Sequence, residues 1–425
     1  MKNAIRVVAA TATLALGGLG LVACSSNSGS GGGGSDEVGP ITYVQGKDTS
    51  GVVNQLAAIW NKDPKHKNQQ VTVKQQSDQA DQQHDDLAQH FQQKLSDYDV
   101  VSTDVVWTSE FAAKGWLQPL TGAYKLDTTP FLPSVVKTGQ YNGIQYAAPS
   151  STDSQILYYR KDLLGDKTPP ANWDEMMADC SIAKKANIPC YTGQFAKYEG
   201  LTVNFNEAIT SAGGTVVDSK GNPTLDTPEA KAGLTRLTTA FADGNIPKAA
   251  LTYQEAQGLA AFETGKMLFL TNWPYAVSAI ENDGTSVVKD KFGIVGYPGK
   301  SAVGGHNLAI SMFSKHKTTA LNFIKFMESS QAQELNIKVA SLAPVLSSEY
   351  ANAALVKQFP YLTTLKASLD NAVARPISPY YPAITTAIEN NTYAALTKAA
   401  NGQDPDVEGT LAAISAAIKA AGSTS

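Results

Sequence analysis

Asp104 and Trp273 stand at places in the sequence where their side chains need a partner. Asp104 lies inside the apolar run 98–107, and a buried carboxylate without a partner is costly. Trp273 follows the apolar run 267–270, and Pro274 ends the predicted strand, so the indole lies beside a loop. A carboxylate accepts two hydroxyl hydrogen bonds at once, and an aromatic ring covers C–H faces. These residue types therefore suit a ligand that is rich in hydroxyl groups.

The same carboxylates allow a catalytic interpretation. Asp104 and Asp153 could be the carboxyl pair of a secreted glycoside hydrolase, in which such groups lie about 5–5.5 or 6.5–9.5 Å apart. The five histidines stand in no recognisable nucleophile motif, and the sequence contains no His-Glu-x-x-His, no spaced Cys/His cluster and no dinucleotide glycine fingerprint. We therefore predict neither a metal nor a cofactor.

The first 35 residues have the features of a targeting sequence. Lys2 and Arg6 precede the apolar run 7–23, which has the form of a signal peptide and is short and glycine-rich for a membrane span. The run ends in LVAC, the bacterial lipobox pattern, so we predict a lipoprotein signal peptide over 1–23 and a diacylglycerol on the thiol of Cys24. Residues 24–35 are dominated by serine and glycine and predict a flexible tether. The protein is expected at the extracellular face of the cell membrane, anchored by lipid.

Length and charge limit the remaining body of the chain. About 400 residues follow, more than one hydrophobic core usually supports, so two lobes are expected. The formal charge of −4 becomes −6 without Lys2 and Arg6, and there is no lysine or arginine stripe, so nucleic acid is not an expected partner. No later run approaches 18 apolar residues, and no further membrane span is expected.

Cys180 and Cys190 remain once Cys24 is assigned to the lipid. In an oxidising extracellular setting we predict a disulfide bond between them, closing a helix-to-loop segment. A closed loop of this size contributes about 2–3 kcal/mol by restricting the unfolded chain. A catalytic thiol is the alternative, but neither cysteine has a histidine nearby in the sequence.

Strand and helix patterns alternate along the chain and predict an α/β fold. Strands are expected over 41–46, 69–76 and 98–107, with helices over 50–62 and 85–95 between them. This order begins an open parallel sheet. Further helices are expected in 169–180, from 206, after Pro228, in 253–280 (on both sides of a strand), in 320–337 and in 406–421.

Five stretches, in order along the chain, resemble the extracellular sugar-binding proteins of bacterial ABC importers. YDVVSTDVVWTSEFAAKGWLQPL (98–120) is similar to the trehalose/maltose-binding branch of solute-binding protein family 1. The other stretches are YNGIQYAAPSSTDSQILYYRKDLLG (141–165), AAFETGKMLFLTNWPY (260–275), GGHNLAISMFSKHKTTALNFIKFMESSQAQ (304–333) and ARPISPYYPAITTAIENNTYAAL (374–396). Each match alone is moderately specific, and their shared order makes the resemblance strong.

The resemblance implies a two-lobe periplasmic-binding-protein fold, or Venus flytrap, with a hinge and a mostly parallel sheet flanked by helices in each lobe. The N-terminal lobe would comprise 36–150 plus 306–345, and the C-terminal lobe 151–305 plus 346–425. Ligand would lie in the crevice at the carboxyl ends of the strands. Binding would favour the closed arrangement, which then docks on the permease.

The resemblance also implies roles for particular side chains. Asp104 and Asp153 would accept hydrogen bonds from ligand hydroxyls, and Trp273, with Tyr275, would stack on a ring. Arg375 would donate to ligand oxygen or form a hinge salt bridge. The full predicted ligand-binding set is Gln45, Lys47, Asp48, Asp104, Asp153, Trp273, Tyr275, Gly305, His306 and Arg375.

Several members of this set carry alternatives. Gln45, Lys47 and Asp48 follow the first predicted strand and should reach the rim of the cleft. His306 follows Gly305 where trehalose/maltose relatives carry tryptophan, so it would stack more weakly or hydrogen-bond in the hinge. We interpret Trp107, which precedes Glu110, as a packing residue.

Together these expectations describe the lipid-anchored, monomeric substrate-binding protein of an ABC importer. It would capture an α-linked disaccharide such as trehalose or maltose, or a short malto-oligosaccharide, and deliver it unaltered to the transmembrane subunits of the permease. A receptor for another small polar solute, such as a different oligosaccharide or a glycerol phosphodiester, is the alternative within the same fold. The glycoside hydrolase is the alternative in another class.

Overall fold

The computed structural model describes residues 37–218 and 220–422. The predicted signal peptide (1–23), the whole predicted tether (24–35) with Cys24, and Asp36 lie outside the described residues. The strands are β1 (Ile41–Gln45), β2 (Val71–Gln75), β3 (Val100–Asp104), β4 (Gln140–Tyr141), β5 (Ile144–Gln145), β6 (Ala147–Ser154), β7 (Ile156–Arg160), β8 (Tyr191–Thr192), β9 (Phe269–Asn272), β10 (Phe292–Gly296), β11 (Ala302–Ile310) and β12 (Val373–Ala374).

Helices separate most of these strands. The α-helices are α1 (Val52–Lys62), α2 (Ala80–Gln92), α3 (Thr108–Ala113), α4 (Pro133–Val136), α5 (Lys161–Leu164), α6 (Trp173–Ala186), α7 (Glu199–Ser211), α8 (Pro228–Ala242), α9 (Glu255–Glu263), α10 (Ala276–Asn282), α11 (Lys317–Met327), α12 (Ser330–Ala340), α13 (Ser347–Ala351), α14 (Ala353–Gln358), α15 (Tyr361–Asp370), α16 (Tyr381–Ala400) and α17 (Val407–Gly422). Short 3-10 helices are η1 (Pro64–His66), η2 (Gly122–Tyr124), η3 (Lys137–Gly139) and η4 (Lys248–Thr252). Within the described chain, no helix combines the length and apolar character needed to cross a membrane.

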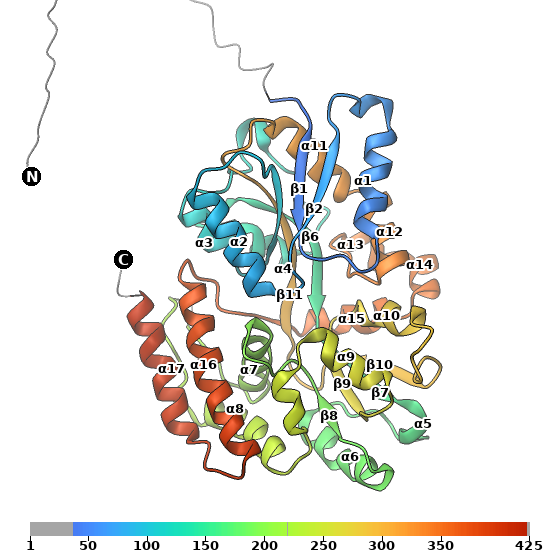
Figure 1. Cartoon of the computed structure of the whole chain (residues 1–425), viewed down its shortest axis with the longest axis vertical. Helices are drawn as coiled ribbons and strands as arrows, with labels where there is room; N and C mark the ends of the chain where they lie inside the picture. Colours follow the sequence, from blue (N-terminus) through green and yellow to red (C-terminus); the bar gives the residue numbers. More distant parts are fainter. Residues whose placement is uncertain (1–36, 219, 423–425) are drawn as a thin grey trace, which may run out of the picture. The chain divides into compact units, whose positions relative to one another are not determined.

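The first lobe is built on a sheet with the strand order β12-β11-β3-β1-β2, and β6 pairs with β11. β1 runs parallel to both β2 and β3, as the alternation of strand and helix predicts. β11 is antiparallel to β3 and β6 because it returns from the other lobe. Helices α1 and α11 cover one face of this sheet and α2 and α3 the other, seen in the upper part of Figure 1.

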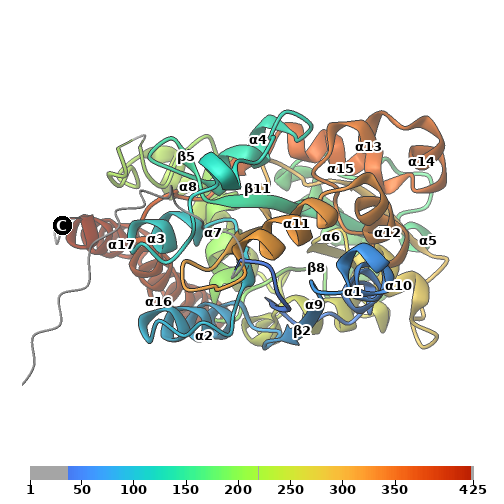
Figure 2. The ribbon, with the colours of Figure 1, turned by 90° about the horizontal axis from the view of Figure 1, so that it is seen from above.

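The second lobe contains a smaller sheet with the order β10-β7-β9-β8. We expected a mostly parallel sheet here, and that detail is wrong: β7 is antiparallel to both β9 and β10, and only β8 and β9 are parallel. The reason lies in the connections, because β7 continues the direction of β6 whereas β9 and β10 run back toward the first lobe. α7, α8, α16 and α17 pack together beside this sheet, and Figures 1 and 2 both show α16 next to α17.

Two of the chain crossings between the lobes meet in a buried polar network. Gln155 separates β6 from β7, and Ser301 precedes β11. The backbone N–H of Gln155 donates to Ser301 Oγ at 2.8 Å, and Ser301 Oγ donates to Glu207 Oε1 of α7 at 3.0 Å. The predicted lobe borders at 150 and 305 fall inside β6 and β11, a few residues from these crossings.

Cys180 and Cys190 lie at the ends of a short segment of the second lobe. Asn172 begins α6 by accepting a hydrogen bond from the backbone of Glu175, and Cys180 lies on this helix. The structure joins the two cysteines in a disulfide bond with a Cα–Cα distance of 5.1 Å. Both are buried, and the carbonyl of Cys190 accepts a hydrogen bond from Phe269 of β9, which links the segment to the sheet.

Candidate functional site

Three neighbouring strands of the first lobe bring predicted site residues together. In the β3–β11 pairing Asp104 stands opposite His306, and in the β6–β11 pairing Asp153 stands opposite Gly304. β11 lies between the other two strands, so both aspartates border the same stretch of β11. This stretch lies at the end of the sheet that adjoins the second lobe, which agrees with a site at the strand ends.

Two glycines of β11 are required by close contacts. A Cβ on Gly304 would lie 2.8 Å from Trp273 Cζ3 and 3.3 Å from Asp153 Cβ. A Cβ on Gly305 would lie 2.3 Å from the carbonyl oxygen of Ser151, and Gly305 also has a φ of +112°, which favours glycine. Gly304 therefore marks the place where the indole from the second lobe meets the first lobe.

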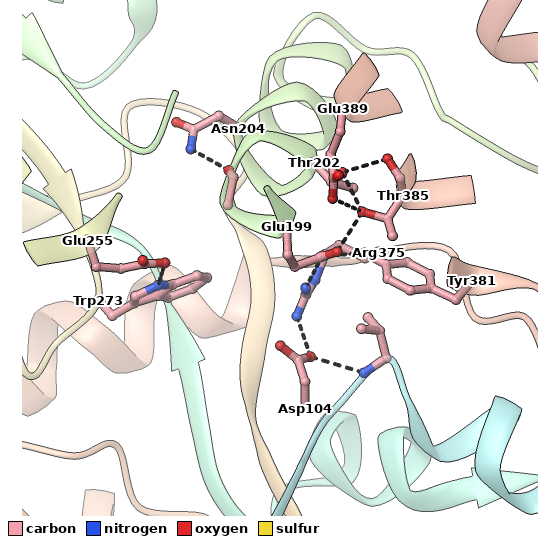
Figure 3. Close-up of polar contacts among 12 residues, drawn as sticks. Asp104, Glu199, Thr202, Asn204, Glu255, Trp273, Arg375, Tyr381, Thr385 and Glu389 are labelled. Atoms are coloured by element: carbon pink, nitrogen blue, oxygen red, sulfur yellow. Dashed lines mark hydrogen bonds and ion pairs between the residues drawn. The ribbon is translucent and has the colours of Figure 1, made fainter. Parts of the chain in front are cut away.

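Trp273 occupies the residue directly after β9, as predicted. The Asn272 side chain accepts a hydrogen bond from the backbone N–H of Trp273 at 2.8 Å, and the Tyr158 hydroxyl donates to its carbonyl oxygen at 2.8 Å. The indole N–H points to Glu255 Oε1 of α9 at 3.5 Å (Figure 3). Tyr275 precedes α10 and is half-buried close to Glu255. The two ends of the indole thus reach both lobes.

Arg375 joins the lobes by ion pairs to two carboxylates. Its Nη2 donates to Asp104 Oδ1 at 2.8 Å, and its Nη1 donates to Glu199 Oε1 at 2.5 Å (Figure 3). Only 2% of the guanidinium side chain is exposed. We predicted that Arg375 either donates to ligand oxygen or forms a hinge salt bridge, and these contacts are salt bridges.

The second-lobe side of this network was not anticipated from the sequence. Glu199, the first residue of α7, also accepts hydrogen bonds from the hydroxyls of Tyr381 and Thr385. The same Thr385 hydroxyl also lies 3.0 Å from Glu389 Oε1. We expected this helix to start at residue 206, yet all residues from 199 to 210 are buried. The sequence holds no local signal for this role, because the partners of Glu199 come from segments far along the chain.

Burial and charge shift the ionisation of the site carboxyls. Burial, together with the neighbouring Asp104 carboxylate, raises the pKa of Asp153 to about 8. Burial likewise raises the pKa of Glu255, and it raises that of Glu199 although the Arg375 charge opposes the shift. Burial lowers the pKa of His306, which keeps this ring neutral near pH 7. Carboxyl groups in such surroundings are typical of functional sites.

Three predicted rim residues do not join this cluster through their contacts. Asp48 accepts hydrogen bonds from the backbone of Ser50, Gly51 and Val53 and thereby holds the start of α1. Gln45 accepts a hydrogen bond from the Tyr43 hydroxyl at 3.1 Å, and Lys47 forms an exposed ion pair with Asp78. A position just after the carboxyl end of a strand is therefore not enough to tell a residue that caps a helix, such as Asp48, from one that contacts ligand.

Trp107 and Glu110 pack within the first lobe. The Trp107 ring meets the edge of His84 and lies against Phe111. Glu110 pairs with His84 at 2.7 Å and with Lys114 at 2.6 Å. Trp107 therefore packs against neighbouring rings of the first lobe, as we interpreted it from the sequence.

Two cavities of the described chain lie away from Trp273 and Asp153, although Arg375 lines the second of them. One, of about 590 Å³, lies between α6 and α8, and the other, of about 780 Å³, lies between α7, α17 and residues 373–380. Trp273 and Asp153 line neither, and both are half-buried where the two lobes meet. No group of three or more metal-ligating side chains occurs in the part of the chain that the structure describes.

The sequence of the chain is similar to those of known solute-binding proteins. The sequence profile of the bacterial extracellular solute-binding proteins matches residues 46–334. A probable ABC transporter-binding protein of Deinococcus radiodurans is 30% identical over 72% of this chain and 76% of its own length. A mannitol-binding protein of Pseudomonas aeruginosa is 24% identical over 71% of this chain and 76% of its own length.

A solved structure shares the fold along most of the chain. The maltose-bound MalE3 of T. maritima superposes with a TM-score of 0.83 and 30% sequence identity, covering 89% of this chain and 99% of that one. The match to the family profile and the similarity to this structure are both consistent with the two sheets described above. The chain therefore belongs to the bacterial extracellular solute-binding protein family.

Proposed function

We propose that the chain is the substrate-binding protein of an ABC importer and captures a sugar between its lobes. The observation that carries the proposal is the meeting of Asp153, Gly304 and Trp273, with Asp104 on the adjoining strand. A sugar presents hydroxyls at its rim and C–H groups on its faces, which suit carboxylates and an indole respectively. Both kinds of group converge here from two lobes.

Closure explains how such a site excludes water. The cluster is half-buried where the two lobes meet, so ligand would enter when the lobes part at Gln155 and Ser301. Ligand that contacts both lobes then favours the closed arrangement. The Asp104–Arg375 ion pair forms part of the same closed contact.

An α-linked disaccharide such as maltose or trehalose, or a short malto-oligosaccharide, is the ligand that we propose. The 30% identical MalE3 was solved with maltose bound, which supports this choice. The mannitol-binding relative supports a polyol as the second candidate. The hydrolase interpretation of Asp104 and Asp153 is not retained, because the family consists of solute-binding proteins.

A thermal-shift screen tests this proposal. Maltose, trehalose, maltotriose, glucose, mannitol and ribitol would each be added at millimolar concentration to residues 36–425. At a hundredfold excess over Kd, binding stabilises the folded state by about 2.7 kcal/mol, which is a measurable rise in Tm. We expect the glucose disaccharides or maltotriose to raise Tm and to remain uncut. A rise with mannitol alone would replace the sugar by a polyol, and no rise with any of them would reject the proposal.

We further infer that Cys24 carries the lipid anchor and that the protein works as a monomer beside its permease. Cys24→Ser should release the protein into the medium and abolish labelling by palmitate in growing cells, whereas palmitate labelling that persists in this variant would contradict the anchor. We also infer that Cys180 and Cys190 are oxidised in the secreted protein. Titration of free thiols in the denatured soluble body should find none.

A further inference from the structure

Carboxyl groups stand at both ends of the Trp273 indole. Its benzene-ring edge lies at Gly304, beside Asp153 of the first lobe. Its pyrrole N–H lies at the other end, 3.5 Å from Glu255 Oε1 of the second lobe (Figure 3). The indole face is therefore framed by one carboxyl group from each lobe.

Glu255 is fixed in this position by three elements. It is the first residue of α9, and its Oε2 accepts a hydrogen bond from the Tyr198 hydroxyl at 2.8 Å. Its backbone carbonyl accepts a hydrogen bond from Asn272 Nδ2 at 3.2 Å, which ties it to the end of β9. Glu255 is half-buried, and Asp104 of the first lobe is close enough to contribute to the rise in its pKa. Such a group is held in place by second-lobe contacts and lies within electrostatic reach of the first lobe.

The positive charge available at this place is already engaged. Arg375 pairs with Asp104 and Glu199, whereas in the described chain no side chain or backbone group donates a hydrogen bond to the Asp153 carboxyl. A ligand that donates hydrogen bonds would satisfy Asp153. A ligand that carries its own negative charge would be left without a cation on burial, because Arg375 is already paired, and each carboxyl of the cluster that is ionised would repel it.

We propose that Glu255 is a ligand-binding residue and that, with Asp153, it restricts the ligand to uncharged, hydroxyl-rich sugars and excludes sugar phosphates and uronic acids. This inference rests on the proposed function and deepens it. A pyranose lying on the indole presents hydroxyls at its rim, and the two carboxyls accept them at opposite ends of the ring. A glycerol phosphodiester falls into the excluded class.

Glu255→Gln tests the inference, with Glu263→Gln at the other end of α9 as the matched control. Calorimetric titration would use maltose and trehalose as neutral probes and maltose 6′-phosphate and trehalose 6-phosphate as anionic probes. In the unaltered protein we expect the neutral sugars to bind at least a hundredfold more tightly than their phosphates. Glu255→Gln should lower the affinity for the neutral sugars about tenfold. It should also reduce the ratio of the affinity for a neutral sugar to the affinity for its phosphate. Glu263→Gln should leave both quantities unchanged.

The ratio separates a binding role from structural damage, because damage would weaken both probe classes equally. Phosphates that bind as tightly as neutral sugars, or a ratio that Glu255→Gln leaves unchanged, would overturn the inference while the proposed function stands. A protein that binds none of the four probes removes the proposed function and the ligand role of Glu255 together. As a readout without ligand, Glu255→Gln should shift one of the five indole N–H signals in a ¹⁵N NMR spectrum, and no shift would contradict the contact with Trp273.

Discussion

Asp104 and Arg375 form an ion pair of 2.8 Å although 271 residues separate them in the sequence. Asp104 ends a strand of the first lobe, and Arg375 also pairs with Glu199, which begins a helix of the second. One guanidinium thus connects the two lobes. Because the same carboxylate borders the proposed sugar site, ligand capture and lobe contact share one residue.

Asp104→Asn should weaken both ligand binding and the lobe contact. Asparagine keeps the shape and an oxygen that can accept from Arg375, but it removes the negative charge. The loss of a charge-assisted hydrogen bond predicts a decrease of about 1.5–3 kcal/mol in the free energy of unfolding, measured by urea denaturation. Sugar affinity should fall about tenfold or more by calorimetry. The exposed Asp166→Asn is the control, and an unchanged affinity in Asp104→Asn would remove Asp104 from the site.

Trp273→Ala should abolish the thermal shift that sugar produces. The indole provides the aromatic face of the proposed site, and alanine leaves nothing for a sugar ring to stack on. Trp173→Ala is the matched control, because Trp173 packs against Tyr191 on the outer side of the second lobe. Both variants should retain their helical circular dichroism. A full shift in Trp273→Ala would show that the indole does not contact ligand.

The strand ends of the site could be predicted from the sequence because local patterns mark them. The position of Trp273 directly after a strand and before Pro274 followed from an apolar run, and the structure has it. Asp104 was expected inside a strand over 98–107, whereas β3 ends at Asp104. Asp48 was predicted as a ligand contact by the same reasoning, yet it caps α1. A pattern locates a residue at a strand end, but the partner of its side chain depends on the loop that follows.

Contacts between distant segments could not be predicted in this way. Glu199 and Glu255 each head a helix of the second lobe, and only the tertiary structure brings them to Arg375 and Trp273. The antiparallel second sheet was missed for the same reason, because strand direction depends on how the chain returns through the hinge. Pairing across hundreds of residues leaves no periodic signal.

Gly304→Ala should weaken sugar binding with little change in the stability of either lobe. The added Cβ would lie 2.8 Å from Trp273 Cζ3, so the indole must move away from β11. Gly296→Ala is the control, because a Cβ on this strand glycine would meet nothing within 4 Å. Calorimetry should show a lower affinity for Gly304→Ala alone. Equal affinities for the two variants would mean that the indole position does not govern binding.

Glu207 makes a pH-dependent contribution to stability at the hinge. It is fully buried on α7 and accepts hydrogen bonds from Ser301 Oγ and from the backbone N–H of Ala302, both at 3.0 Å. Burial raises its pKa from 4.5 to about 8. Between these two values the folded state binds more protons at this site than the unfolded state, so the contribution of Glu207 to stability falls as the pH rises through the window and is constant above it.

Glu207→Gln removes this titration while keeping an oxygen that accepts both hydrogen bonds. The difference in unfolding free energy, variant minus unaltered protein, should therefore become more positive from pH 5 to pH 8 and level off by pH 9. Urea denaturation at each pH measures it, and subtraction of the unaltered protein cancels the titration of Asp153 and Glu389, whose pKa values are also raised to about 8. The exposed Glu229→Gln should give a flat difference over the same range. If Glu207→Gln also gives a flat difference, Glu207 ionises in the folded hinge as it does in the unfolded chain, and the two crossings are held by hydrogen bonds to a charged carboxylate.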